Sequence, residues 1–213
     1  MEKNNTAWHA EVISPEVADT ARRLAGVEAL RNFYLAGGTA LALHLGHRRS
    51  VDLDFFSGDA FNEDMLVATL QALPELSILA KSTQTLHLQV CGVKVSFIGY
   101  SYPLLFSLGQ FRGLAVADAR DIACMKLSAL ASRGSRRDFV DLYVAAQRYG
   151  LPQLLEFFQR KFAQANYSVV HVQKSLVYFV DAEKEPMPAM LLPLSWEEVK
   201  AFFSREVRNL RSS

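Results

Sequence analysis

The stretch that most restricts the fold of this chain runs from Phe33 to Ser57 and reads FYLAGGTALALHLGHRRSVDLDFFS. Its opening apolar run stops at Gly37-Gly38, which predicts a short strand followed by a tight turn. Strong helix formers fill positions 40–45, and Thr39 is a candidate cap for that helix. The alternation over residues 51–55 then predicts a second strand. We therefore expect strand, glycine turn, helix and strand, with a turn whose backbone could approach a phosphate closely.

Asp52 and Asp54 form the chemical feature of this stretch. Side chains of a strand alternate between its faces, so the two aspartates should point together, while Val51, Leu53 and Phe55 point toward the core. Two adjacent carboxylates repel each other unless a cation lies between them. Oxygen ligands of this kind suit Mg²⁺ or Mn²⁺ held together with substrate phosphates.

These residues carry a family resemblance. Gly37-Gly38-Thr39 followed by Asp52-x-Asp54 resembles the GG(S/T)…DxD signature of the DNA-polymerase-β-like nucleotidyltransferase superfamily. The longer segment LAGGTALALHLGHRRSVDLDFF is similar to the AbiEii/AbiGii toxin group within it. The similarity extends through DIACMK, which ends at Lys126, and through RDFVDL, which begins at Arg137. Each motif alone is weak, but their combination and spacing are specific, and they cover roughly residues 30–145.

The resemblance implies a fold and an activity. The fold would be α+β, a nucleotidyltransferase-type mixed sheet flanked by helices over residues 14–116, followed by a helical part over 117–213 that completes the cleft. The activity would be transfer of a nucleoside monophosphate from an NTP, with Mg²⁺ or Mn²⁺, to an acceptor such as tRNA. It would serve a toxin of a toxin–antitoxin or phage-defence system, with a cognate antitoxin as partner. The alternative is a protein of the same fold that binds nucleotide or a protein partner without turnover.

The resemblance also assigns roles to individual residues. Asp52 and Asp54 would hold the metal. Phosphate binding would fall to the backbone and hydroxyl of the GGT turn and to two cations; these residues are Gly37, Gly38, Thr39, Arg49 and Lys126. Asp138 or Asp141 would support Lys126 or activate the acceptor.

Each of the later residues also has a plain structural explanation. Lys126 borders the apolar stripe of its helix, so its stem could lie along the core while its ammonium reaches solvent. Asp138 and Asp141 could complement a helix dipole and pair with nearby arginines. Arg49, the preferred member of His47-Arg48-Arg49, could belong to a solvated turn.

One expected feature of the superfamily is missing. Residues 86–90 and 93–97 alternate in polarity around Cys91-Gly92, which predicts a β-hairpin beside the DxD strand. The superfamily usually carries a third metal-binding carboxylate on such a strand, and at that position this chain has Ser96. The departure weakens the prediction of a complete two-metal site. His87 could face the same cleft, although a lone histidine on a strand is more often an ordinary sheet residue.

Composition excludes several classes. A chain of 213 residues with 50% hydrophobic composition can bury a sizeable core, and its net charge of +1 excludes attraction of nucleic acid by the whole surface. Cys91 and Cys124 lack metal-binding spacing, which favours packing in the core and a reducing compartment. No apolar run has the length of a membrane span and the N-terminus lacks a signal peptide, so we expect a cytoplasmic protein without membrane contact.

The remaining segments are predicted mostly as helices. Ser14-Pro15 begins one that should reach Arg31, and Asp118, with Asp121 three residues later, should cap another as a variant capping box. Further helices are expected over 62–73, 136–149, 154–162, 169–180 and 196–210. The aromatic face of Phe157, Phe158 and Phe162 is predicted to be core, and the proline-rich segment 181–195 to be a loop or linker.

Overall fold

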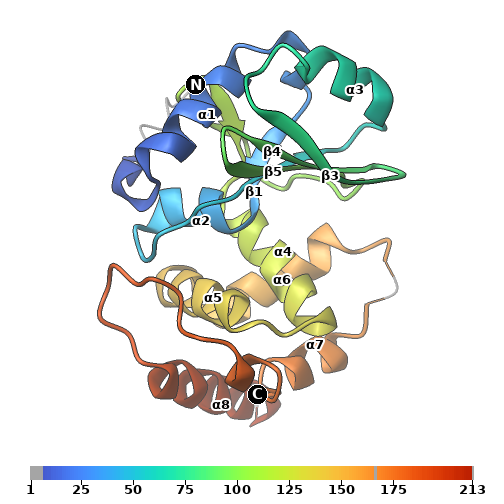
Figure 1. The fold of residues 1–213 in the computed structure, drawn as a ribbon. Helices are drawn as coiled ribbons and strands as arrows, with labels where there is room; N and C mark the ends of the chain where they lie inside the picture. The colour runs from blue at the N-terminus through green and yellow to red at the C-terminus, as the bar shows by residue number, and fades with distance from the viewer. Residues whose placement is uncertain (1–6, 166, 213) are drawn as a thin grey trace.

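The computed structural model describes residues 7–165 and 167–212 as a mixed sheet with helices on both faces and a helical half below it (Figure 1). Seven strands form the sheet in the order β3-β4-β5-β2-β1-β7-β6. Their bounds are β1 Tyr34–Ala36, β2 Leu53–Ser57, β3 Leu76–Ser82, β4 Thr85–Val90, β5 Val93–Gly99, β6 Gly109–Phe111 and β7 Leu114–Val116. Two central pairs, β1 with β7 and β2 with β5, are parallel, which confirms the expected mixed α/β class.

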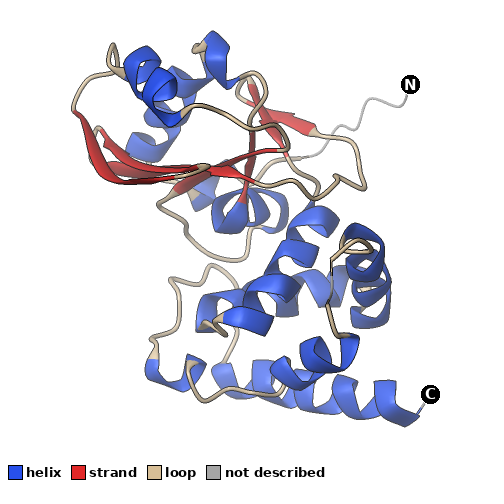
Figure 2. Ribbon diagram, turned by 90° about the vertical axis from the view of Figure 1, so that its right-hand side faces the viewer, coloured by secondary structure: helices blue, strands red, loops and turns tan. Residues whose placement is uncertain are grey.

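The helices divide between the two halves. α1 Pro15–Ala25 and α3 Glu63–Leu70 cover one face of the sheet, and α2 Gly37–Leu45 lies on the face toward the helical half (Figures 1 and 2). The helical half contains α4 Ala119–Ser132, α5 Arg136–Tyr149, α6 Leu151–Lys161, α7 Val169–Ser175 and α8 Trp196–Ser212. One hydrophobic cluster takes its buried residues from 12–122 and a second from 123–207.

Several predicted elements are confirmed in detail. Ser14 caps α1 with its side chain, Asp118 caps α4, and the hairpin of β4 and β5 turns at Cys91-Gly92. On this hairpin, the apolar set that includes Leu88 and Val95 is fully buried, as the alternation required. Phe158 and Phe162 are buried and Phe157 is half-buried, so the aromatic face packs in the core.

The structure corrects other boundaries. α1 ends at Ala25 rather than Arg31, because Gly26 stops it and a 3₁₀ turn over Glu28–Leu30 follows. β2 begins only at Leu53, so Val51 is 61% exposed instead of facing the core. The helix expected to 180 ends at Ser175.

One cysteine and one edge of the sheet also differ from expectation. Cys124 is buried as predicted, whereas Cys91 at the hairpin turn is only half-buried. β3 was not predicted, since its residues are almost all exposed and its sequence does not alternate. It forms one edge of the sheet through pairing with β4 alone.

The segment 181–195 is an ordered connection rather than a free linker. It contains a 3₁₀ turn at Ala182–Lys184 and then runs beside the loop between α2 and β2. Arg49 N donates to Ala189 O at 2.8 Å, Leu191 N donates to His47 O at 2.9 Å, and Arg48 forms an isolated bridge with Met190. We call the loop 46–52, which carries His47, Arg48 and Arg49, the basic loop. We call residues 185–192 the strap, because their backbone contacts join the helical half to the basic loop.

Candidate active site

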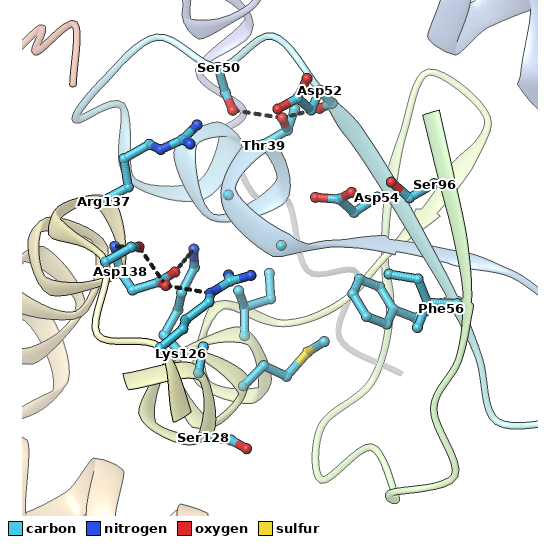
Figure 3. Close-up of a pocket in the computed structure, with 18 of the residues that line it drawn as sticks. Thr39, Ser50, Asp52, Asp54, Phe56, Ser96, Lys126, Ser128, Arg137 and Asp138 are labelled. Carbon is cyan, nitrogen blue, oxygen red and sulfur yellow. Dashed lines mark hydrogen bonds and ion pairs between the residues drawn. The ribbon is translucent and has the colours of Figure 1, made fainter. Parts of the chain in front are cut away.

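A cleft of about 640 Å³ lies between the sheet and the helical half. Figure 3 shows it with Asp52, Asp54 and Ser96 on the sheet side and Lys126 and Asp138 on the helical side. Its lining includes Gly37, Gly38, Thr39, Arg48, Asp52, Asp54, His87, Lys94, Ser96, Lys126, Arg133, Arg137, Asp138 and Glu185. The cleft therefore collects most of the residues that the sequence singled out.

The glycine turn and β2 meet at the floor of the cleft. Gly37 is the first residue of α2 and has a φ of 65°, a left-handed conformation that favours glycine. A Cβ at Gly37 would lie 2.8 Å from Asp54 Oδ2, so a larger residue at position 37 would displace this carboxylate. A Cβ at Gly38 would collide with Arg48 Nη2.

Thr39 does not cap α2, whose N-cap is Ala36. It lies within the helix, where its hydroxyl donates to Ser50 Oγ at 2.8 Å and contacts Asp52 O. The short strand β1 leads directly into α2, so the helix begins three residues earlier than its composition indicated. Thr39 instead ties α2 to the segment that carries Asp52.

Asp52 and Asp54 fit a divalent cation. Both line the cleft and are half-buried, and within residues 7–165 and 167–212 neither side chain has a hydrogen bond or an ion pair. The described residues contain no group of three histidine, cysteine or acidic side chains that could hold a metal. A carboxylate pair open to the cleft suits one ion that also binds substrate phosphates.

Ser96 lies where the hairpin register predicted. It pairs with Asp54 across the parallel strands β2 and β5, is 3% exposed and lines the cleft. His87 pairs with Ser96 across β4 and β5, and His87 Nδ1 lies 3.0 Å from Ser96 Oγ. Both side chains thus face the cleft, and the position expected to hold a third carboxylate holds the Ser96 hydroxyl.

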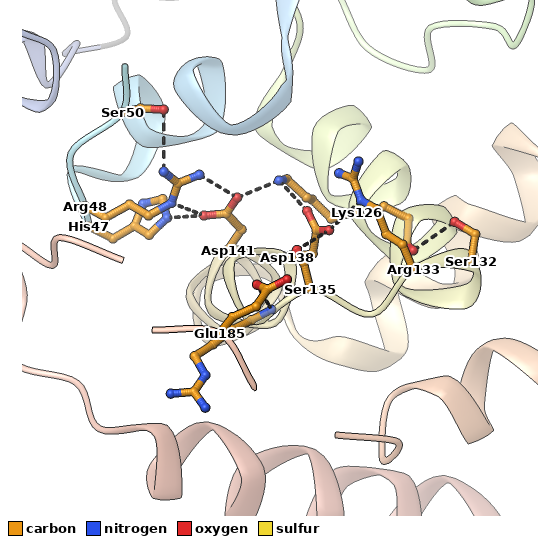
Figure 4. Close-up of polar contacts among 12 residues, drawn as sticks. His47, Arg48, Ser50, Lys126, Ser132, Arg133, Ser135, Asp138, Asp141 and Glu185 are labelled. Carbon is orange, nitrogen blue, oxygen red and sulfur yellow. Dashed lines mark hydrogen bonds and ion pairs between the residues drawn. The ribbon is translucent and has the colours of Figure 1, made fainter. Parts of the chain in front are cut away.

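On the helical side, Lys126 joins two aspartates of α5 (Figure 4). Its Nζ lies 2.7 Å from Asp138 Oδ1 and 2.7 Å from Asp141 Oδ2, and the residue is only 7% exposed. The hypothesis that the Lys126 ammonium reaches solvent is therefore wrong. Burial alone would lower its pKa, but the two carboxylates raise it above the ordinary value and hold the ammonium charged.

Asp138 and Asp141 are fully engaged. Asp138 also accepts hydrogen bonds from Ser135 Oγ at 2.7 Å and Arg133 Nε at 3.1 Å. Burial would raise the pKa of Asp138, but Lys126 and Arg133 bring it below the ordinary value. The pKa of Asp141 is held further down, because burial is outweighed by Lys126 and Arg48.

The arginine that the structure brings to the cleft is Arg48, not Arg49. Its guanidinium forks onto Asp141 with Nε–Oδ1 at 2.6 Å and Nη2–Oδ2 at 2.9 Å, and it is 5% exposed. His47 Nε2 lies 2.8 Å from the same carboxylate. Arg49 is exposed and its side chain is not part of the lining. The run HRR marked the loop, but it could not indicate which arginine turns inward.

A second buried ion pair was not foreseen. Asp121, expected to belong to a capping box, is fully buried and accepts from Lys161 Nζ at 2.8 Å. It also accepts hydrogen bonds from the backbone N–H groups of Leu105 and Phe106. Lys161 comes from α6, far along the chain, so local spacing carried no signal for this contact.

Comparison with known proteins agrees with this geometry. The family model for the nucleotidyl transferase AbiEii toxin of type IV toxin–antitoxin systems matches residues 21–89 and 93–210. The chain belongs to the AbiEii nucleotidyltransferase toxin family. A protein of Aquifex aeolicus is 36% identical to this AbiEii family member over 202 residues, which cover 92% of this chain and 96% of the relative.

Solved structures share the fold of this AbiEii family member. MenT4, a nucleotidyltransferase toxin from Mycobacterium tuberculosis, has a TM-score of 0.52 and 17% identity, covering 91% of this chain and 84% of its own. A proposed nucleotidyltransferase from Helicobacter pylori has a TM-score of 0.51 and 18% identity, covering 93% and 96%. At these sequence identities the structures show a shared fold and nothing more.

Within the described residues, none of the helices is both long and apolar enough to cross a bilayer.

Proposed function

We propose that this nucleotidyltransferase transfers a nucleoside monophosphate from an NTP to RNA, such as tRNA, with a divalent cation as cofactor. The observation that carries the proposal is the arrangement of the cleft. The carboxylates of Asp52 and Asp54, which have no partner among the described residues, face the helix α2 on one side and the cations Lys126 and Arg48 on the other. Such a site neutralises a triphosphate from several directions, and phosphoryl transfer depends mainly on positioning and charge.

Each group has a defined task in this proposal. Asp52 and Asp54 would hold Mg²⁺ or Mn²⁺, which when bound neutralises charge on the phosphates. The backbone at Gly37 and Gly38 offers N–H donors at the start of α2. Lys126 directs positive charge toward the cleft from between its two aspartates.

Asp138 and Asp141 hold these cations in the proposed mechanism. Their carboxylates already accept from Lys126, Arg48 and Arg133, so they position the ammonium and the guanidinium. Both are poor bases because these cations lower their pKa. Arg49, exposed beside the strap, would contact the acceptor rather than the triphosphate.

We further propose a toxin role checked by a cognate antitoxin, in a toxin–antitoxin or phage-defence system. The family assignment supports this role. The second candidate is a member of the same fold that binds nucleotide or a protein without turnover. Ser96 favours this alternative, since it lies beside Asp54 where the superfamily usually has a carboxylate.

Incubation with each α-labelled NTP, Mg²⁺ or Mn²⁺ and total RNA separates these functions. We expect label in RNA from the wild type and none from Asp54→Asn, which has nearly the same shape without the charge. Label on the protein would indicate protein nucleotidylation instead. Nucleotide binding without label anywhere would contradict transfer and support the binding-only candidate.

A further inference from the structure

Three polar side chains form a row across adjacent strands at the floor of the cleft. Asp54 of β2 lies opposite Ser96 of β5, and Ser96 lies opposite His87 of β4. The Ser96 hydroxyl is almost fully buried, yet it borders the cleft, and its partner among the described residues is the His87 ring at 3.0 Å. His87 is half-buried and borders the same cleft. The row thus leads from the carboxylate pair to an imidazole.

The reaction needs a group that accepts the proton of the acceptor hydroxyl. Asp138 and Asp141 are unsuited, because each already accepts from at least two cationic side chains. Asp52 and Asp54 are assigned to the cation. The imidazole of His87 has no ion pair among the described residues, and its hydrogen bond to Ser96 leads toward the cleft. Imidazole is the side chain most often used for general base catalysis near neutral pH.

We propose that Ser96 and His87 together take the proton of the acceptor hydroxyl, with Ser96 as the catalytic hydroxyl and His87 as the base behind it. This inference rests on the proposed nucleotidyl transfer. It assigns to the pair the proton-accepting task that a carboxylate at position 96 would otherwise perform.

The step balances in atoms and electrons. The acceptor oxygen forms a bond to the α-phosphorus while the bond between that phosphorus and the bridging oxygen breaks, and pyrophosphate leaves with the electron pair. The acceptor proton passes to Ser96 Oγ as the Ser96 proton passes to His87 Nδ1. His87 then returns a proton to solvent, which its partial exposure allows. Proton transfer from Ser96 Oγ to His87 Nδ1 requires the neutral tautomer of His87 with its hydrogen on Nε2.

Several charged groups of the cleft lie around His87. On neighbouring strands of the same face these are Lys94 of β5 and Asp54 of β2, while Ala80, which pairs with it on β3, carries no charge. Asp52, just before β2, and Arg48 also line the cleft. The helical side contributes Lys126, Arg133, Arg137, Asp138 and Glu185. All of them remain in a His87 variant, so the two proteins differ in the cleft only at position 87.

The test compares His87→Gln with wild type in single-turnover transfer from α-labelled NTP to total RNA. Gln keeps a hydrogen-bonding side chain but cannot take up a proton. We expect the rate to fall about 100-fold at neutral pH, the low end for general base catalysis, with NTP affinity unchanged. The wild-type rate should fall on acidification, because a protonated imidazole cannot accept a proton. The variant should lack that fall. His171→Gln, at an exposed histidine with one ring hydrogen bond outside the cleft, is the matched control and should match wild type.

Ser96→Asp added to His87→Gln supplies a carboxylate at the same place and should recover at least tenfold of the lost rate. An active wild type with His87→Gln equally fast, or slower with the same pH profile, would overturn the proton path alone. Failure of Ser96→Asp to recover rate would also overturn it, because His87 would then act other than through position 96. A wild type that labels no acceptor overturns the proposed function and this inference together. Thermal unfolding of each variant shows that the comparison is made between folded proteins.

Discussion

Lys126 is the residue on which the acidic side of the cleft depends. Lys126→Met keeps the stem volume but leaves Asp138 and Asp141 buried with less positive charge. Removing one partner of a buried ion pair costs about 3–5 kcal/mol, and we expect the low end because Arg48 and Arg133 remain. Urea unfolding measures the free energy directly. Lys94→Met, at an exposed lysine of the same cleft, is the control and should change it by less than about 0.5 kcal/mol.

The same carboxylates predict how stability depends on pH. The pKa values of Asp138 and Asp141 are lowered in the folded state, so they bind protons more readily when unfolded. Their stabilisation is complete above the unfolded pKa of about 3.9 and is lost as the pH falls through the lower folded values. Asp138→Asn should therefore flatten the acid limb of a plot of unfolding free energy against pH. An acid limb as steep as that of wild type would contradict the assignment.

At this scale the sequence predicted residues better than partners. The motifs predicted that Asp52, Asp54, Lys126 and Asp138 lie in one cleft, and all four line it. Motif spacing carries this information because members of a family share one backbone fold. Which arginine of HRR turns inward depends on Asp141, which lies 93 residues away from Arg48. Contacts of such separation leave no trace in local spacing.

Among the elements, the start of α2 places the DxD carboxylates. Gly37→Ala should cost about 1–2 kcal/mol for left-handed backbone, and its Cβ would also push on Asp54. Gly92→Ala is a matched control, because it has a φ of 78° and no atom within 4 Å of its Cβ. We expect similar or smaller destabilisation at Gly92 with Mn²⁺ affinity unchanged, and loss of Mn²⁺ affinity at Gly37. Calorimetric titration of Mn²⁺ measures the affinity, and equal affinity in both variants would contradict the role of Gly37.

Elements with a strong local pattern were predicted, and those without one were missed. The hairpin of β4 and β5 alternates cleanly, so even the position of Ser96 followed from its register. β3 is an exposed edge strand formed by pairing with β4, and its sequence LSILAKS does not alternate in polarity. The strap has prolines typical of a linker, yet backbone hydrogen bonds to the basic loop order it.

For the whole molecule, the cleft exists because two hydrophobic clusters meet along α4. Their general positions followed from composition and periodicity, while the polar contacts that fix them together did not. Asp121 and Lys161 are such a contact, joining α4, α6 and the connection after β5 in fully buried surroundings. Binary patterns cannot predict a buried charge pair, because each member alone reads as a surface residue.

This pair gives an asymmetric prediction. Asp121→Asn removes the charge that compensates Lys161, whose ammonium would retain Pro103 O as a neutral acceptor. We expect a loss of about 3–5 kcal/mol in the free energy of unfolding. Lys161→Met should cost less, since the Asp121 carboxylate keeps the N–H groups of Leu105 and Phe106. Chemical denaturation of both variants measures the difference. Equal losses, or a larger loss for Lys161→Met, would mean that the backbone donors do not stabilise this carboxylate.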